Sequence, residues 1–217
     1  MDLLRLGLLG GVLGLDSTAV GQFMVSRPLV AGWLAGWVAG VPEFGITIGA
    51  VLEVFLLVSF PTGGARFPEG STAAVVAVGV AAPYESPDVV AGAVAIGLFW
   101  GQFGGWTVTL QRNVNGWLVP RANVAEQGVL ARAHAVAVLI DFARGMIVTA
   151  AGIWLGGFAL GFVGRAWRTD GSISSGVLFV GAAVSLGIML HDLGGFRRRR
   201  ILFVAGLALG IVGARFL

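Results

Sequence analysis

Six side chains that carry charge or form strong hydrogen bonds lie inside apolar stretches of the sequence: Asp16, Gln22, Glu53, Gln102, Asp141 and Arg144. Because a polar group is costly to bury in apolar surroundings, such groups are the best indicators of a functional site. Glu53 is the clearest case, since it stands within the apolar run 44–60 with no basic residue within one helical turn along the sequence. A lone carboxylate there either faces a polar cavity or becomes neutral. We therefore interpret Glu53 as a ligand- or cavity-facing residue, with a structural hydrogen bond as the alternative.

The segment 60–72 follows the Glu53 run and contains two prolines, three glycines, three hydroxyl side chains and Glu69. Its Pro and Gly content predicts a non-helical stretch, enclosed by protein and close to Glu53. Carboxylates, amides and hydroxyls suit a neutral sugar, whose hydroxyls both donate and accept hydrogen bonds. We therefore predict a substrate-binding set of Glu53, Glu69, Thr62 and Gln22. An ordinary surface loop is the alternative interpretation of this segment.

The remaining polar groups have simpler explanations. Asp141 and Arg144 are three residues apart, so they share a helix face and are predicted to form a structural ion pair. Gln102 is as well suited to an interhelical hydrogen bond as to a ligand contact. His134 and His191 stand apart from carboxylate clusters, and cysteine is absent, so we expect no metal and no cofactor. Neither an H-E-x-x-H nor a G-x-S-x-G motif is present, which disfavours a membrane enzyme.

The composition indicates which elements hold these residues. The 217 residues are 57% hydrophobic and 12% charged, against about 25% charged in soluble domains. Together with a mean hydropathy of +0.90, this predicts an all-α, polytopic membrane protein forming one domain over 1–217 and embedded in the lipid bilayer. Two segments, 28–41 and 71–83, are too short to span and predict re-entrant or broken helices, whereas 131–163 is long enough to be tilted, broken or two pieces. The eight expected segments are 3–25, 28–41, 44–60, 71–83, 88–111, 131–163, 172–190 and 201–217.

The distribution of arginines predicts the orientation of the chain. All 14 basic residues are Arg, and the run 197–200 is the densest cluster. Cytoplasmic loops attract basic residues, so this loop and the loop 112–130 are expected on the cytoplasmic side, with 84–88 and 164–171 opposite. The same rule explains the basic balance of the chain without nucleic acid as a partner.

Small residues spaced four apart predict places where helices approach closely. Gly97, Gly101 and Gly105 form a continuous stripe, which is the strongest such pattern in a glycine-rich sequence. Further pairs with the same spacing include Gly36/Gly40, Gly152/Gly156 and Gly206/Gly210.

Three blocks in sequence order resemble the IIC subunits of the mannose/fructose/sorbose family of phosphotransferase systems (PTS). They are residues 21–30 (GQFMVSRPLV), 45–53 (GITIGAVLE) and 61–69 (PTGGARFPE). The resemblance implies a permease subunit that binds a hexose and moves it across the bacterial inner membrane, together with a IID membrane subunit and as part of an oligomer. It also implies that soluble IIA and IIB subunits carry out the phosphotransfer, so that this chain is not itself an enzyme.

A second interpretation is a non-transporting membrane scaffold or sensor of a degenerate, regulatory PTS. Pro61 and Glu69, where family members usually have an amide and an aspartate, favour it. Glu53 and Gln22, which match the family, favour transport.

Overall fold

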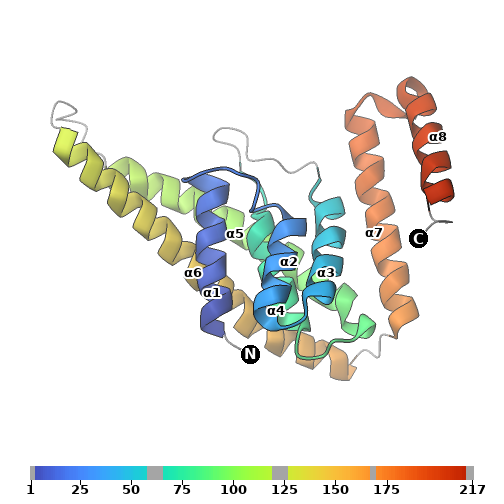
Figure 1. The fold of residues 1–217 in the computed structure, drawn as a ribbon, viewed down its shortest axis with the longest axis horizontal. Helices are drawn as coiled ribbons and strands as arrows, with labels where there is room; N and C mark the ends of the chain where they lie inside the picture. Colours follow the sequence, from blue (N-terminus) through green and yellow to red (C-terminus); the bar gives the residue numbers. More distant parts are fainter. Residues whose placement is uncertain (1–2, 58–65, 119–126, 167–169, 214–217) are drawn as a thin grey trace.

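All regular secondary structure in the described part of the chain is helical. The computed structural model describes residues 3–57, 66–118, 127–166 and 170–213, which contain eight α-helices, one short 3-10 helix and no strand (Figure 1). The all-α membrane fold and the number of segments are therefore confirmed. The helices are α1 (Leu3–Thr18), α2 (Pro28–Ala39), α3 (Pro42–Phe55), α4 (Gly70–Ala81), η1 (Pro87–Val89), α5 (Val90–Leu118), α6 (Gln127–Ala166), α7 (Gly171–Asp192) and α8 (Gly195–Gly213).

The helices differ in whether they can cross a bilayer. Three of those described are long and apolar enough to do so, over Pro87–Leu118, Gly128–Phe162 and Gly171–Asp192. The 12-residue α2 and α4 are shorter apolar helices, as expected from the segments 28–41 and 71–83. The open question for 131–163 is also answered, because α6 is one continuous helix of 40 residues and its sequence contains no proline.

Two expected boundaries are wrong. The segment 3–25 is helical only as far as Thr18, because the chain then turns through Gly21 (φ +90°) and the Asp16 carboxylate accepts hydrogen bonds from the N–H groups of Phe23 (2.7 Å) and Ser26 (2.8 Å). The segment 60–72 is non-helical over 66–69, but α4 already begins at Gly70. Residues 60–65 lie outside the described residues.

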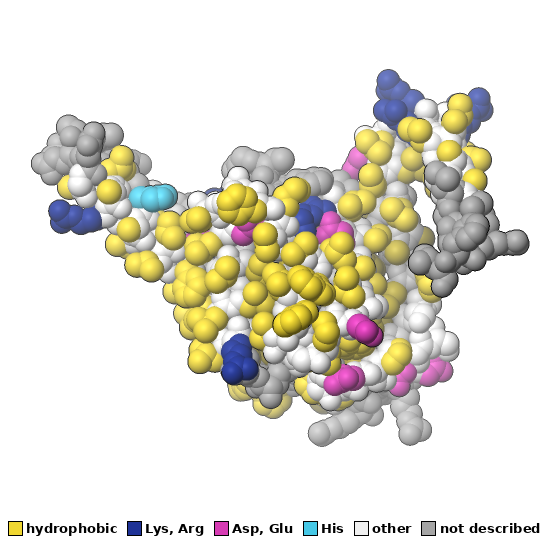
Figure 2. Space-filling view, in the orientation of Figure 1, with side chains coloured by type: hydrophobic (Ala, Val, Ile, Leu, Met, Phe, Trp, Pro, Cys, Tyr) yellow, Lys and Arg dark blue, Asp and Glu magenta, His cyan; other side chains and the backbone are white. Residues whose placement is uncertain are grey.

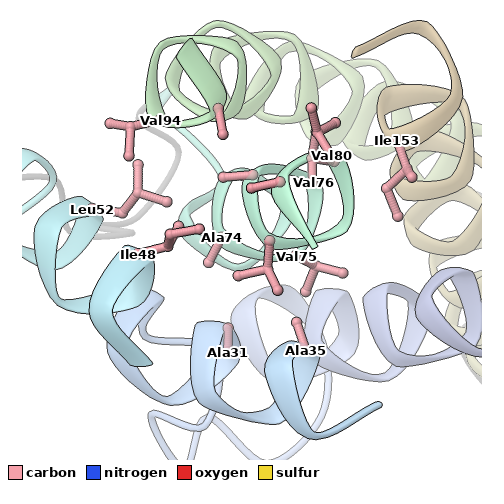
Figure 3. Close-up of a cluster of buried hydrophobic side chains, with 14 of the residues drawn as sticks. Ala31, Ala35, Ile48, Leu52, Ala74, Val75, Val76, Val80, Val94 and Ile153 are labelled. Atoms are coloured by element: carbon pink, nitrogen blue, oxygen red, sulfur yellow. The ribbon is translucent and has the colours of Figure 1, made fainter. Parts of the chain in front are cut away.

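Helix α4 occupies the centre of the protein. All of its residues from Ser71 to Ala81 are buried, as expected of a helix that is apolar on every side. Figure 3 shows its valines between side chains of α2, α3, α5 and α6. The labelled members of this core are Ala31, Ala35, Ile48, Leu52, Ala74, Val75, Val76, Val80, Val94 and Ile153.

Glycines set the closest helix contacts. A Cβ atom added to Gly45 of α3 would lie 2.5 Å from the carbonyl oxygen of Gly32 in α2, so the two backbones touch. The expected stripe on α5 is also an interface, because a Cβ atom on Gly97 would lie 2.5 Å from the carbonyl oxygen of Ala73 and one on Gly101 3.2 Å from that of Glu69. Gly40 has a different role: with φ +83° it ends α2 in a left-handed turn that leads into α3.

The helix ends alternate between two sides of the protein (Figure 1). The C-terminal end of α5, the N-terminal end of α6 and the turn between α7 and α8 lie on the upper side. The start of α5, the end of α6 and the start of α7 lie on the lower side, which matches the alternation expected from the arginines.

Asp170 begins α7 by accepting a hydrogen bond from the Ile173 N–H (2.8 Å), and this bond keeps the pKa of Asp170 below its usual range.

Candidate functional site

Glu69 and Arg144 form a buried, two-armed ion pair. Glu69 stands at the residue before α4, and Arg144 projects from α6. The Nη2 and Nη1 groups of Arg144 donate to Oε1 (2.7 Å) and Oε2 (3.0 Å) of Glu69, and the Thr72 hydroxyl donates to Oε2 (2.8 Å). The Glu69 side chain is 0% exposed and that of Arg144 is 9% exposed. Bidentate pairs of this kind are the strongest and most directional ion pairs in proteins.

Arg144 also binds Asp141 and Thr107, so the predicted Asp141–Arg144 pair is part of a larger network. Its Nε group donates to Asp141 Oδ1 (2.9 Å), and Nη1 donates to the Thr107 hydroxyl of α5 (3.1 Å). The Thr18 hydroxyl at the end of α1 donates to the other oxygen of Asp141. The network thus joins α1, α5, α6 and the start of α4. It contains one guanidinium and two carboxylates, which leaves one formal negative charge among these groups.

Two glycines line this network. A Cβ atom on Gly104 of α5 would lie 2.6 Å from Oε2 of Glu69. A Cβ atom on Gly14 of α1 would lie 3.6 Å from Oε1 of Glu69 and 3.5 Å from Nη2 of Arg144. The absence of a side chain at Gly104 therefore makes room for the Glu69 carboxylate, whereas Gly14 packs against the ion pair at ordinary contact distance.

Glu53 has a partner that the sequence pattern did not reveal. The Nε group of Arg27 donates to Glu53 Oε1 (2.7 Å), Nη2 contacts the same oxygen, and the Leu29 N–H at the start of α2 donates to Oε2 (3.2 Å). The assumption that Glu53 is isolated from basic groups is therefore wrong. The α2–α3 hairpin brings residues 26 positions apart together, because the first turn of α2 packs beside the last turn of α3. The Glu53 side chain remains 20% exposed.

The carboxylates of Glu53 and Glu69 stand at helix ends that meet. A Cβ atom on Gly70, the first residue of α4, would lie 3.0 Å from the Pro28 ring of α2 and 3.7 Å from Leu56 at the end of α3. The N-terminal ends of α2 and α4 and the C-terminal end of α3 thus converge, as Figure 1 also shows. A helix N-terminus carries partial positive charge, which favours a nearby carboxylate. Glu53 lies beside the start of α2, and Glu69 lies at the start of α4.

Of the other predicted substrate residues, Gln22 alone lies among the described residues, and none of the hydrogen bonds given above involves it. Gln22 lies in the loop between α1 and α2, with an exposed side chain and a left-handed backbone (φ +53°). Thr62 lies outside the described residues. Gln102, the other polar residue considered for a ligand contact, is exposed on α5. No group of three potential metal ligands occurs in the part of the chain that the structure describes.

Four contributors were not predicted as site residues: Arg27, Thr18, Thr107 and Thr72, of which only Thr72 lies in the polar segment 60–72. Arg27 had one signal, since it directly precedes a proline that begins a helix and so stands at a helix start. Thr18 and Thr107 had none, because a threonine inside an apolar helix commonly bonds to its own backbone, as the Thr107 hydroxyl does with Gly104 O (2.6 Å).

An all-α protein with apolar outer surfaces, and with buried charges at the ends of short helices, has the architecture of a polytopic membrane transport protein. Comparison with known families agrees with this class. The sequence model of the family described as "PTS system sorbose-specific IIC component" matches residues 1–192, so the chain belongs to this family of membrane transporter components.

Two solved structures share the fold. One, described as a membrane protein, superposes with a TM-score of 0.76 at 16% identity, covering 99% of this chain and 92% of its own. The other, the mannose transporter ManYZ in complex with microcin E492, superposes with a TM-score of 0.63 at 17% identity and the same coverage. At these identities the likeness shows the fold alone. No functionally curated protein matches the sequence significantly.

Proposed function

We propose that this chain is the sugar-translocating IIC subunit of a mannose-type PTS in the bacterial inner membrane. It binds a hexose and moves it across the membrane together with a IID subunit, while IIA and IIB subunits carry out the phosphotransfer. Membership of the IIC family supports the transporter role. The observation that carries the proposed sugar site is the convergence of three helix ends beside a partly exposed carboxylate, Glu53.

The two carboxylates are suited to different roles. A carboxylate has about four acceptor positions, and the described bonds to Glu53 use three of them. Together with its partial exposure, this leaves Glu53 able to accept a bond from a sugar hydroxyl. Glu69 is fully buried against Arg144, so it acts as a positioning residue that fixes the start of α4. Thr62 and Gln22 complete the proposed hydroxyl-binding set.

The test is hexose affinity of the IIC chain co-expressed with its IID partner. Glu53→Gln should weaken binding roughly ten- to a hundred-fold, because each factor of ten corresponds to about 1.4 kcal/mol and a charged acceptor contributes about that much or more. Glu43→Gln is the matched control, since Glu43 is exposed on the same helix. Thermal unfolding of each variant separates loss of binding from loss of folding. Parental affinity in Glu53→Gln would exclude Glu53 from the site.

One observation favours a second function, a non-transporting scaffold or sensor of a regulatory PTS. Glu53 and Glu69 both already have arginine partners, which is what purely structural carboxylates would show. If the intact IIC–IID pair binds no hexose, the scaffold replaces transport as the function. Saturable hexose transport by that pair would exclude it.

A further inference from the structure

The turn between α7 and α8 carries the densest positive charge of the chain. Arg197, Arg198, Arg199 and Arg200 occupy the first turns of α8, and all four are exposed. Figure 2 shows dark blue side chains gathered at the upper end of this helix pair. The turn is tight, because Gly194 (φ +101°) and Gly195 (φ +77°) both adopt left-handed conformations.

An apolar cleft opens directly below this turn, between α7 and α8. It is lined by Leu186, Met189, Leu193, Phe203, Gly206 and Leu207, among other apolar residues. The lining covers the last two turns of α7, so the cleft is about 11 Å long. At Gly206 an added Cβ atom would have no neighbour within 4 Å, which shows that this part of the cleft is open space.

The arginines stand at the mouth of the cleft. The Arg199 Nε group donates to the carbonyl oxygen of Leu193 (3.3 Å), and Leu193 itself lines the cleft. The Arg198 side chain lies over Gly194, with its Cδ atom 3.1 Å from the position of an added Cβ. The arginine run is therefore adjacent to the apolar lining, at the end of the helix pair where a membrane headgroup would lie.

We propose that the α7–α8 cleft is a binding site for an anionic phospholipid. One acyl chain lies along the apolar lining, and the arginines at the mouth hold the phosphate. Guanidinium groups bind phosphate oxygens through paired hydrogen bonds, and basic clusters beside a membrane helix attract anionic lipids. The cleft distinguishes this site from simple topological anchoring, since positive charge on a loop needs no apolar groove beneath it.

The first part of the test asks whether the arginines select the lipid, and it measures lipid retention. The purified full chain, in mixed micelles of phosphatidylglycerol and phosphatidylcholine with the same acyl chains, is examined by native mass spectrometry. Phosphatidylglycerol should be retained at least about tenfold over phosphatidylcholine, given the attraction expected from several arginines. Changing all four arginines to Gln should abolish the preference, and changing all four to Lys should preserve most of it. Equal retention of both lipids by the parent chain would overturn the proposal.

The second part of the test changes the apolar cleft and leaves every charge in place. Gly206→Leu should fill the cleft and reduce phosphatidylglycerol retention at least about fivefold, since it excludes the acyl chain. Gly176→Leu is the matched control, because an added Cβ at Gly176 on α7 also meets nothing within 4 Å and Gly176 is not among the cleft residues. Unchanged retention in Gly206→Leu would overturn the lipid site. So would displacement of the lipid by inorganic phosphate alone, or a Gly206→Leu variant whose only change is its oligomeric state.

Discussion

Removal of the Arg144 guanidinium tests the buried network most directly. Arg144→Gln would leave Glu69, which is 0% exposed, and Asp141 without their cation. Breaking a buried ion pair by removing one partner typically costs about 3–5 kcal/mol, because the remaining charge stays buried without compensation. Two carboxylates are affected here, so we expect a loss at the upper end of that range. For a chain of this size, such a loss corresponds to a fall in Tm of roughly 10 °C or more.

The assay is thermal unfolding in detergent, followed by circular dichroism. Arg132→Gln is the control, since Arg132 is an exposed arginine on the same helix and surface substitutions usually stay within about 0.5 kcal/mol. Asp141→Asn should be much milder than Arg144→Gln, because it removes the surplus negative charge, its amide oxygen can still accept from Arg144, and its NH2 group can donate to the Thr18 hydroxyl. If Arg144→Gln unfolds at the same temperature as Arg132→Gln, the network contributes nothing and our interpretation of it fails.

Three further predictions concern helix packing and buried hydroxyls. Gly45→Ala should lower Tm by several degrees, because its Cβ atom would lie 2.5 Å from the Gly32 carbonyl oxygen. Gly157→Ala is the control and should leave Tm unchanged, since nothing lies within 4 Å of its added Cβ atom. Equal Tm values for the two variants would refute the close contact. Thr149→Val should leave Tm unchanged or raise it, since its buried hydroxyl has no hydrogen-bond partner among the described residues. Thr107→Val should lower Tm, because it removes an acceptor from Arg144, and Tm shifts of the same sign in both variants would contradict this assignment.

The sequence predicted the helices well because their apolar segments are separated by Pro, Gly and charged breaks. The shortness of α2 and α4 followed from the segment lengths, and the α5 interface followed from its glycine spacing. The non-helical stretch was extended too far, to residue 72, because Ser71 and Thr72 suggest a loop by composition and yet are buried within the first turn of a core helix.

The site was only partly predictable. The spacing of Asp141 and Arg144 indicated their pairing, since it depends on one helix. The partners of Glu53 and Glu69 come from positions 26 and 75 residues away, and no local pattern reports contacts of that range. Tertiary packing therefore decided which of the polar residues met.

The central position of α4 has a consequence for how the chain enters the membrane. Its 12 residues measure about 18 Å, well short of the roughly 30 Å of hydrocarbon in a bilayer. A segment of this length cannot insert by itself as it leaves the ribosome. Its unpaired helix ends would be exposed to lipid until α5 and α6, which cover it, have also been synthesised. We therefore expect α4 to reach its buried position only after α5 and α6 have been synthesised.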